Sequence, residues 1–219
     1  LTTLTITQQS VFDEWMSRLE DAPLFAFDTE TTSLNYMQAE IVGVSFAVEP
    51  GEAAYVPLAH INPGLEGQLN REQVLEQLRP LLESDAVKKV GQHLKYDANV
   101  LANHGISLRG IAHDTMLESY VLDAVGSRHD MGSLALKYLG QRVISFEEVA
   151  GKGAKQITFD HVPIEQAAEY AAEDADVTLR LHEALMPRLE AEPKLREVYE
   201  DLELPLVPVL SKIERNGAY

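Results

Sequence analysis

Two acidic residues follow a short apolar run near the start of the chain. Leu24 to Phe27 are all apolar, and Asp28-Thr29-Glu30 come directly after them. An uninterrupted apolar run of this length is typical of a β-strand that is buried on both faces. Residues two apart in a strand share a face, so Asp28 and Glu30 should lie side by side. Like charges in that arrangement destabilise a strand unless something neutralises them, which constrains both the fold and its chemistry.

Two interpretations of this acidic pair are open from the pair alone. Mg²⁺ and Mn²⁺ prefer hard oxygen ligands, so two neighbouring carboxylates can bind a divalent cation. Alternatively, the strand simply ends there and both carboxylates face water, which is the commoner situation for an isolated Asp-x-Glu. The two interpretations differ in whether further acidic residues of the chain lie beside this pair.

The composition is that of a globular protein without disulfides. Of the 219 residues 45% are hydrophobic, and there is no cysteine, which excludes disulfides and thiolate metal sites. No apolar stretch approaches the roughly 20 residues of a membrane span, and the first residues show no charged-then-apolar pattern, so we do not expect secretion. We therefore expect a cytoplasmic protein with no membrane partner.

The charge of the chain restricts how it can bind nucleic acid. A net charge of −17 opposes the phosphate neutralisation by Lys and Arg on which such binding usually depends. Metal ions held by carboxylates can supply the missing positive charge, as can a partner domain. Leu1 is not an initiator Met, and the turn signal Asn216-Gly217 lies close to the last residue. We expect the chain to be a fragment of a longer protein.

The order of expected strands predicts a mixed sheet. Strands at 25–31, 40–48 and 53–58 follow one another with short connections, which is typical of an antiparallel meander. Later short strands at 87–90 and 111–112 alternate with helices, which indicates parallel strands with crossover helices. The expected fold class is α/β: a mixed β-sheet, antiparallel at first and parallel later, flanked by helices.

The expected helices carry further acidic residues. Helices are predicted over 71–82, 94–104 and 163–185, with Pro187 interrupting the last of them. Ser10 is the expected N-cap of a first helix.

Two helical segments repeat one spacing between a polar residue and an aspartate. His93 and Asp97 are four apart at the start of a helix, and Tyr170 and Asp174 are four apart among alanines. Residues at this spacing share a helix face. A capped helix start explains the first pair equally well, and a solvated acidic helix explains isolated acids near the second. The Tyr one turn before an Asp is the more informative signal.

The ordered set of motifs resembles a known family. Asp28-Thr29-Glu30, Gln92 to Asp97, and Tyr170 to Asp174 look like the three motifs of the DEDD 3′–5′ exonuclease superfamily, and Tyr170 makes the chain resemble the DEDDy branch. Further blocks at 114–120, 128–131, 146–153 and 170–178 resemble the proofreading domains of bacterial DNA polymerase I, family A. The resemblance covers essentially the whole chain.

This resemblance implies a ribonuclease H-like fold and two-metal hydrolysis of DNA. The expected cofactors are two divalent cations, Mg²⁺ or Mn²⁺, with Zn²⁺ as an alternative at one position. Asp28, Glu30 and Asp174 would hold the first metal, with Asp28 bridging to a second metal that Asp97 supports. Tyr170 would orient the attacking water, since a phenol with a pKa of about 10 is a poor base at pH 7.

The resemblance also implies a substrate and a domain division. The expected substrate is a single-stranded or frayed DNA 3′ end, degraded to deoxynucleoside monophosphates during replication and repair in a bacterial cytoplasm. Residues 1–203 would form the exonuclease domain, and 204–219 would begin the polymerase domain that is its partner. His93 stands where many members carry Asn, and His can also donate a hydrogen bond. The expected substrate-binding residues are Thr31, Leu34, Gln92, His93, Tyr96, Arg128, Met131 and Phe146.

Two alternatives stay open beside this interpretation. An RNA-processing 3′–5′ exonuclease of the same superfamily would share the metals and differ in substrate. An inactive domain that acts as a scaffold for a polymerase would need no metal, and the four intact carboxylates argue against it.

Overall fold

A single mixed sheet organises the chain in the computed structural model, which describes residues 1–126 and 128–217. Within these residues the strand order is β1-β4-β3-β2-β5-β6. β2 pairs antiparallel with β3, and β3 with β4, while β5 and β6 run parallel to β2. The predicted mixed sheet is confirmed. The strands are β1 (Thr2–Thr5), β2 (Phe25–Thr31), β3 (Ile41–Glu49), β4 (Glu52–Pro57), β5 (Lys89–Gly91) and β6 (Ile111–Asp114).

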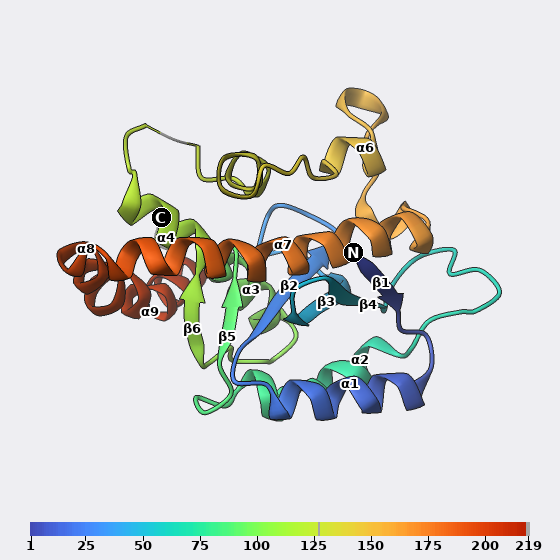
Figure 1. The fold of residues 1–219 in the computed structure, drawn as a ribbon. Coiled ribbons are helices and arrows are strands. Elements are labelled where there is room, and N and C mark those ends of the chain that lie inside the picture. Colours follow the sequence, from blue (N-terminus) through green and yellow to red (C-terminus); the bar gives the residue numbers. More distant parts are fainter. Residues whose placement is uncertain (127, 218–219) are drawn as a thin grey trace.

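Helices cover both faces of this sheet (Figure 1). The long helix α7 crosses one face, and α1 and α2 lie on the other. The α-helices are α1 (Gln9–Asp21), α2 (Arg71–Leu82), α3 (Leu94–Asn103), α4 (Thr115–Leu122), α5 (Met131–Leu134), α6 (Phe146–Ala150), α7 (Ile164–Glu190), α8 (Pro193–Glu197) and α9 (Leu204–Arg215). Single turns of 3₁₀ helix lie at Gly153–Lys155 and Phe159–His161, and π-helical turns at Ala135–Leu139 and Val198–Glu203.

The two faces of β2 are packed with side chains of different size. Phe25 and Phe27 belong to the large core shared with α1 and α2. Ala26 points to the other face, where it packs with Ala172 and Ala175 of α7. Small side chains on both elements let the backbone of α7 approach the sheet closely. Because side chains alternate along a strand, the even-numbered acids of β2 also face α7.

The N-cap of α1 and the effect of Pro187 on α7 differ from those expected. Phe12 N–H donates to Gln8 O, so α1 begins a residue before Ser10, and Ser10 is not its N-cap. Pro187 does not interrupt α7, which continues to Glu190. The carbonyl that Pro187 leaves without its helical donor belongs to the exposed Glu183, where water can replace the lost hydrogen bond. Burial of Leu189 keeps the last turn against the core.

One buried aspartate joins two helices at the ends of β5 and β6. The carboxylate of Asp114 accepts from the backbone N–H of Leu94 at 2.8 Å and of His93 at 3.2 Å, at the start of α3. It also accepts from the N–H of Met116 and Leu117, in the first turn of α4. A single side chain therefore satisfies the free donors of two helix N-termini.

We expect Asp114→Ala to lower the free energy of unfolding by about 2–4 kcal/mol, since each lost cap costs about 1–2 kcal/mol. Asn70→Ala is the matched control, because Asn70 caps α2 alone through the N–H of Gln73. It should cost about 1 kcal/mol in the same urea titration. If both variants lowered the free energy of unfolding by the same amount, Asp114 would stabilise only one of the two helices.

Candidate active site

Three carboxylates converge where β2 meets α7. One oxygen from each of Asp28, Glu30 and Asp174 lies within 4.8 Å of the other two. The first two project from the same face of β2, and the third comes from the alanine-rich part of α7. The spacing of two along the strand thus produced the expected pair, and the close approach of α7 adds the third group.

A fourth carboxylate, that of Asp97 on α3, is hydrogen-bonded to β2. Thr29 donates to Asp97 Oδ1 twice, from its backbone N–H at 3.1 Å and from its hydroxyl at 2.5 Å. Asp97 is buried in the first turn of α3, where the helix dipole favours a negative charge. It lines the same cleft as the other three carboxylates.

Without a bound cation, burial and mutual repulsion disfavour the ionised form of these four carboxylates. Burial, followed by the charge of Asp174, raises the pKa of Asp28 to about 8. Burial also raises the pKa values of Glu30, Asp97 and Asp174 well above their ordinary range. Among the described residues, Glu30 Oε1 is buried without a hydrogen-bond partner. An all-oxygen ligand set with an unpartnered oxygen fits a hard divalent cation.

Tyr170 stands beside these carboxylates, one turn before Asp174 on α7. Its ring packs against Phe146 and Phe159, with centroid separations of 6.3 and 5.9 Å. Burial and the neighbouring carboxylates raise the pKa of its phenol, so the hydroxyl keeps its proton at neutral pH. Tyr170 can therefore donate a hydrogen bond into the cleft.

The carboxylates lie in a cleft of about 660 Å³, next to a second cavity of about 460 Å³. Tyr96, Phe146 and Tyr170 line both cavities. Seven of the eight predicted substrate-binding residues line one or both of them. In the cleft are Gln92, His93, Tyr96, Met131 and Phe146, and in the second cavity are Thr31, Leu34, Tyr96 and Phe146.

The arginine that lines the cleft is Arg142, whereas the sequence predicted Arg128. Arg128 lines neither cavity; its side chain is exposed and lies 3.6 Å from the carboxylate of Asp130. Arg142 lines the cleft and pairs with Glu148 at 3.1 Å. Sequence reasoning missed Arg142, and the only signal was a basic residue four positions before Phe146 in an acidic chain.

Several cleft side chains are held by hydrogen bonds. Tyr96 Oη donates to Ser33 O at 2.6 Å, and Gln92 Nε2 donates to His129 O at 2.7 Å. His93 has φ 64°, the left-handed region in which Asn and His are enriched among non-glycine residues. This backbone conformation gives a physical reason for either residue at position 93.

Comparison with known proteins decides the family. A model of a 3′–5′ exonuclease family matches residues 3–190. The chain belongs to this family. It is 64% identical to DNA polymerase I of Pseudomonas aeruginosa over 97% of its own length, and 46% identical to that of Rhizobium leguminosarum over 98%. The chain spans only 24% and 22% of the length of these relatives. Exonucleases of the family need divalent metal ions, which agrees with the acidic group described above.

Solved structures share the fold. Pol1 of M. smegmatis, solved with DNA primer-template and dNTP, gives a TM-score of 0.75 at 19% identity, covering 97% of this chain and 32% of that one. Escherichia coli RNase D gives 0.69 at 17% identity, covering 97% and 51%. The ribonuclease H-like fold is thereby confirmed. In the described part of the chain, no helix is both long and apolar enough to cross a bilayer.

We expect Asp174→Asn to stabilise the metal-free chain increasingly as the pH rises from about 4 to 8. The raised pKa values mean that the folded wild type binds more protons than the unfolded chain, so its stability falls as those protons leave. Removing one carboxylate relieves part of that loss. Thermal unfolding in EDTA at several pH values measures the difference between variant and wild type.

The exposed variant Asp13→Asn is the control, because no such difference should develop there. A difference for Asp174→Asn that stays constant with pH would contradict the expected electrostatic strain.

Proposed function

We propose that the chain hydrolyses the terminal phosphodiester bond of single-stranded or frayed DNA 3′ ends and releases deoxynucleoside monophosphates. The convergence of Asp28, Glu30 and Asp174 in one cleft, beside Tyr170, carries this proposal. Membership of the 3′–5′ exonuclease family supports the direction of hydrolysis. Similarity to DNA polymerase I favours DNA as substrate and proofreading as the role.

The carboxylates would hold two divalent cations. Asp28, Glu30 and Asp174 are proposed to bind one ion, with Asp28 shared with a second ion that Asp97 supports. Their hard oxygen atoms favour Mg²⁺ or Mn²⁺, and Zn²⁺ is an acceptable substitute at one position. Bound ions would supply a nucleophilic hydroxide near neutral pH and stabilise the departing 3′-oxygen.

Tyr170 is proposed to orient the attacking water. Its phenol keeps its proton, so it serves as a hydrogen-bond donor and not as the general base. The aromatic contacts with Phe146 and Phe159 hold its ring in place. Its position one turn before Asp174 sets the hydroxyl beside the metal ligands.

The second cavity is proposed to receive the terminal bases. Leu34 is 95% exposed at its edge, and Phe146 presents a partly exposed ring. Stacking on such side chains is worth about 1–3 kcal/mol per base and does not depend on which base is present. That tolerance suits removal of any mismatched nucleotide. Arg142 replaces Arg128 as the preferred candidate for contact with the DNA backbone, because it lines the cleft.

The wider organisation of the protein is also a proposal. We keep 1–203 as the exonuclease domain and 204–219 as the start of a polymerase segment; Ala218 and Tyr219 lie outside the described residues. α9 is fixed to α3, since Ser211 donates to Asn99 at 2.5 Å and Lys95 pairs with Glu214 at 2.7 Å. The bacterial relatives support a bacterial cytoplasm as the location.

RNA is the alternative substrate, and the fold shared with RNase D is the observation in its favour. We expect the chain to release mononucleotides from a 3′-labelled DNA strand faster than from RNA of the same sequence. Faster release from RNA would overturn the choice of DNA.

Asp28→Ala should abolish Mg²⁺-dependent release of mononucleotides, because it removes the shared metal ligand. Tyr170→Phe should lower the rate by about 10- to 100-fold, the value of one hydrogen bond to a charged group. Tyr120→Phe is the matched control, since Tyr120 is exposed and lines neither cavity. A wild-type chain without activity at high concentration would favour the scaffold alternative.

Phe146→Ala should raise KM for single strands by about 5- to 100-fold, and by the same factor for every terminal base. A mismatched duplex end should be degraded faster than a paired one, because it unpairs at lower cost. Steady-state kinetics on four 3′-terminal bases, paired and mismatched, measures both effects. A base-specific change in KM would contradict the stacking role.

A further inference from the structure

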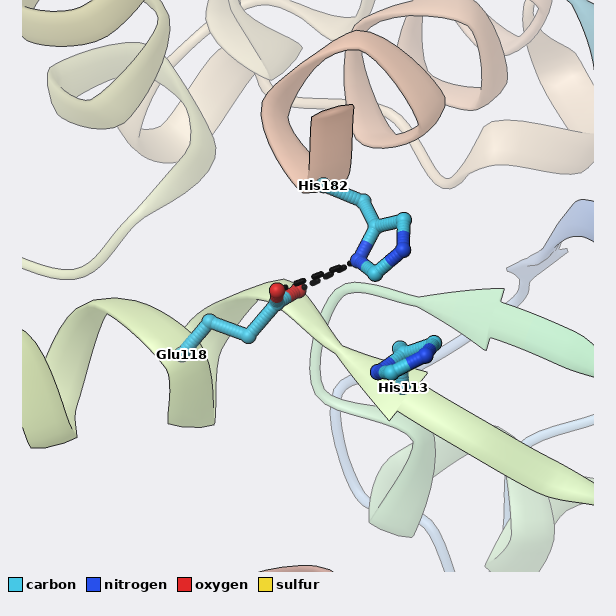
Figure 2. Close-up of side chains that lie close together, drawn as sticks. All are labelled: His113, Glu118 and His182. Carbon is cyan, nitrogen blue, oxygen red and sulfur yellow. Dashed lines mark hydrogen bonds and ion pairs between the residues drawn. The ribbon is translucent and has the colours of Figure 1, made fainter. Parts of the chain in front are cut away.

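A second group of potential metal ligands lies outside the cleft. His113 of β6, Glu118 of α4 and His182 of α7 each offer one ligand atom within 4.8 Å of the others. Figure 2 shows the side chains of Glu118 and His182 pointing toward one another, with the ring of His113 beside them. His182 follows Asp174 by eight residues on α7, about 12 Å along the helix axis, so the two groups are distinct.

The contacts within this group are short and directed. His182 Nδ1 lies 3.0 and 3.1 Å from the two carboxylate oxygens of Glu118. The rings of His113 and His182 have centroids 4.1 Å apart, at 32°. Tetrahedral Zn²⁺ with bonds of about 2.0–2.1 Å places its ligand atoms roughly 3.3 Å apart. The Glu118–His182 separations are also those of a hydrogen bond, so an ion bound to both side chains would take the place of the proton on His182 Nδ1.

Glu118 lacks a permanent counter-charge. It is fully buried, and in the part of the chain that the structure describes its one ion-pair contact is with His182. A buried carboxylate without a charged partner is costly, and either a proton or a divalent cation would remove that cost.

Outer contacts orient the ring of His113. Its Nδ1 lies 3.0 Å from Tyr199 Oη, and that same oxygen accepts from the N–H of Asp114 at 3.1 Å. Tyr199 is fully buried, so the contact is fixed. A metal-binding histidine characteristically uses one ring nitrogen for such a contact and the other for the ion. His113 is partly exposed.

We propose that His113, Glu118 and His182 bind one Zn²⁺ ion and that this ion fastens α7 to β6 and α4. Two imidazoles and one carboxylate suit Zn²⁺ and disfavour the hard cations expected in the cleft. Because α7 also carries Tyr170 and Asp174, such an ion would fix the helix that delivers them.

The test uses the whole chain carrying Asp28→Ala and Asp174→Ala, which removes the carboxylate site. Zn²⁺ added alone should bind at one ion per chain in calorimetry and raise the melting temperature. Adding His113→Phe keeps an aromatic ring against Tyr199 and removes one ligand. It should weaken binding by more than about 100-fold, beyond the loss expected for an outer contact. His161→Phe, at an exposed histidine outside the group, should change neither value.

Glu118→Gln is the second variant, since it keeps the volume of the side chain, and circular dichroism checks that each variant folds. Co²⁺ should give the intense visible bands of a four-coordinate site, which His113→Phe and Glu118→Gln abolish. No Zn²⁺ binding in the double variant, or binding that His113→Phe and Glu118→Gln leave unchanged, would overturn the proposal. No hydrolysis is measured, so the result is independent of the proposed nuclease function.

Discussion

Repulsion among buried carboxylates is the constraint on which the remainder of this structure depends. Asp28, Glu30 and Asp174 each place a carboxylate oxygen within 4.8 Å of the other two, and Asp97 is hydrogen-bonded to the same strand. Such a group persists only if the surrounding structure determines its position, because each acid would gain solvation by moving apart. The large hydrophobic core behind β2 and the caps at Asp114 supply that rigidity. A preformed anionic site of this kind loses little entropy when it binds cations.

Small side chains on the long helix α7 determine how closely it approaches the sheet. Ala172 and Ala175 allow its backbone to lie against Ala26, which brings Asp174 to the acids of β2. Farther along, buried Asp176 accepts from the N–H of Gly51 at 2.8 Å and so attaches the helix to the β3–β4 turn. Several independent contacts therefore fix the register of α7 on the sheet. That register sets the distance between its carboxylate and those of the strand.

Short-range periodicity explains which features could be predicted from sequence. The spacing of two in β2 predicted that Asp28 and Glu30 share a face, because a strand has a fixed repeat. That Asp97 and Asp174 join them was implied by the resemblance to the exonuclease motifs and not by periodicity. Contacts between distant segments were not predictable. The contacts of Asp114 with two helix starts depend on α3 lying beside α4, which no local pattern describes. The parallel pairing of β1 with β4 was not evident from the sequence.

The same limit applies to His113, Glu118 and His182, which come from three elements and follow no single spacing. Local rules also failed where tertiary packing outweighs them. Pro187 remains inside α7 because burial of Leu189 offsets one missing hydrogen bond. The choice between Arg128 and Arg142 depended on loop paths, which periodicity does not describe.

Anomalous X-ray diffraction from crystals of the chain soaked in Mn²⁺ measures metal binding at β2 most directly. We predict an anomalous peak within about 2.3 Å of oxygens from Asp28, Glu30 and Asp174, and a second peak between Asp28 and Asp97 at high Mn²⁺ concentration. Crystals at neutral pH with no peak beside these three carboxylates, or with their side chains turned apart toward solvent, would contradict the metal site.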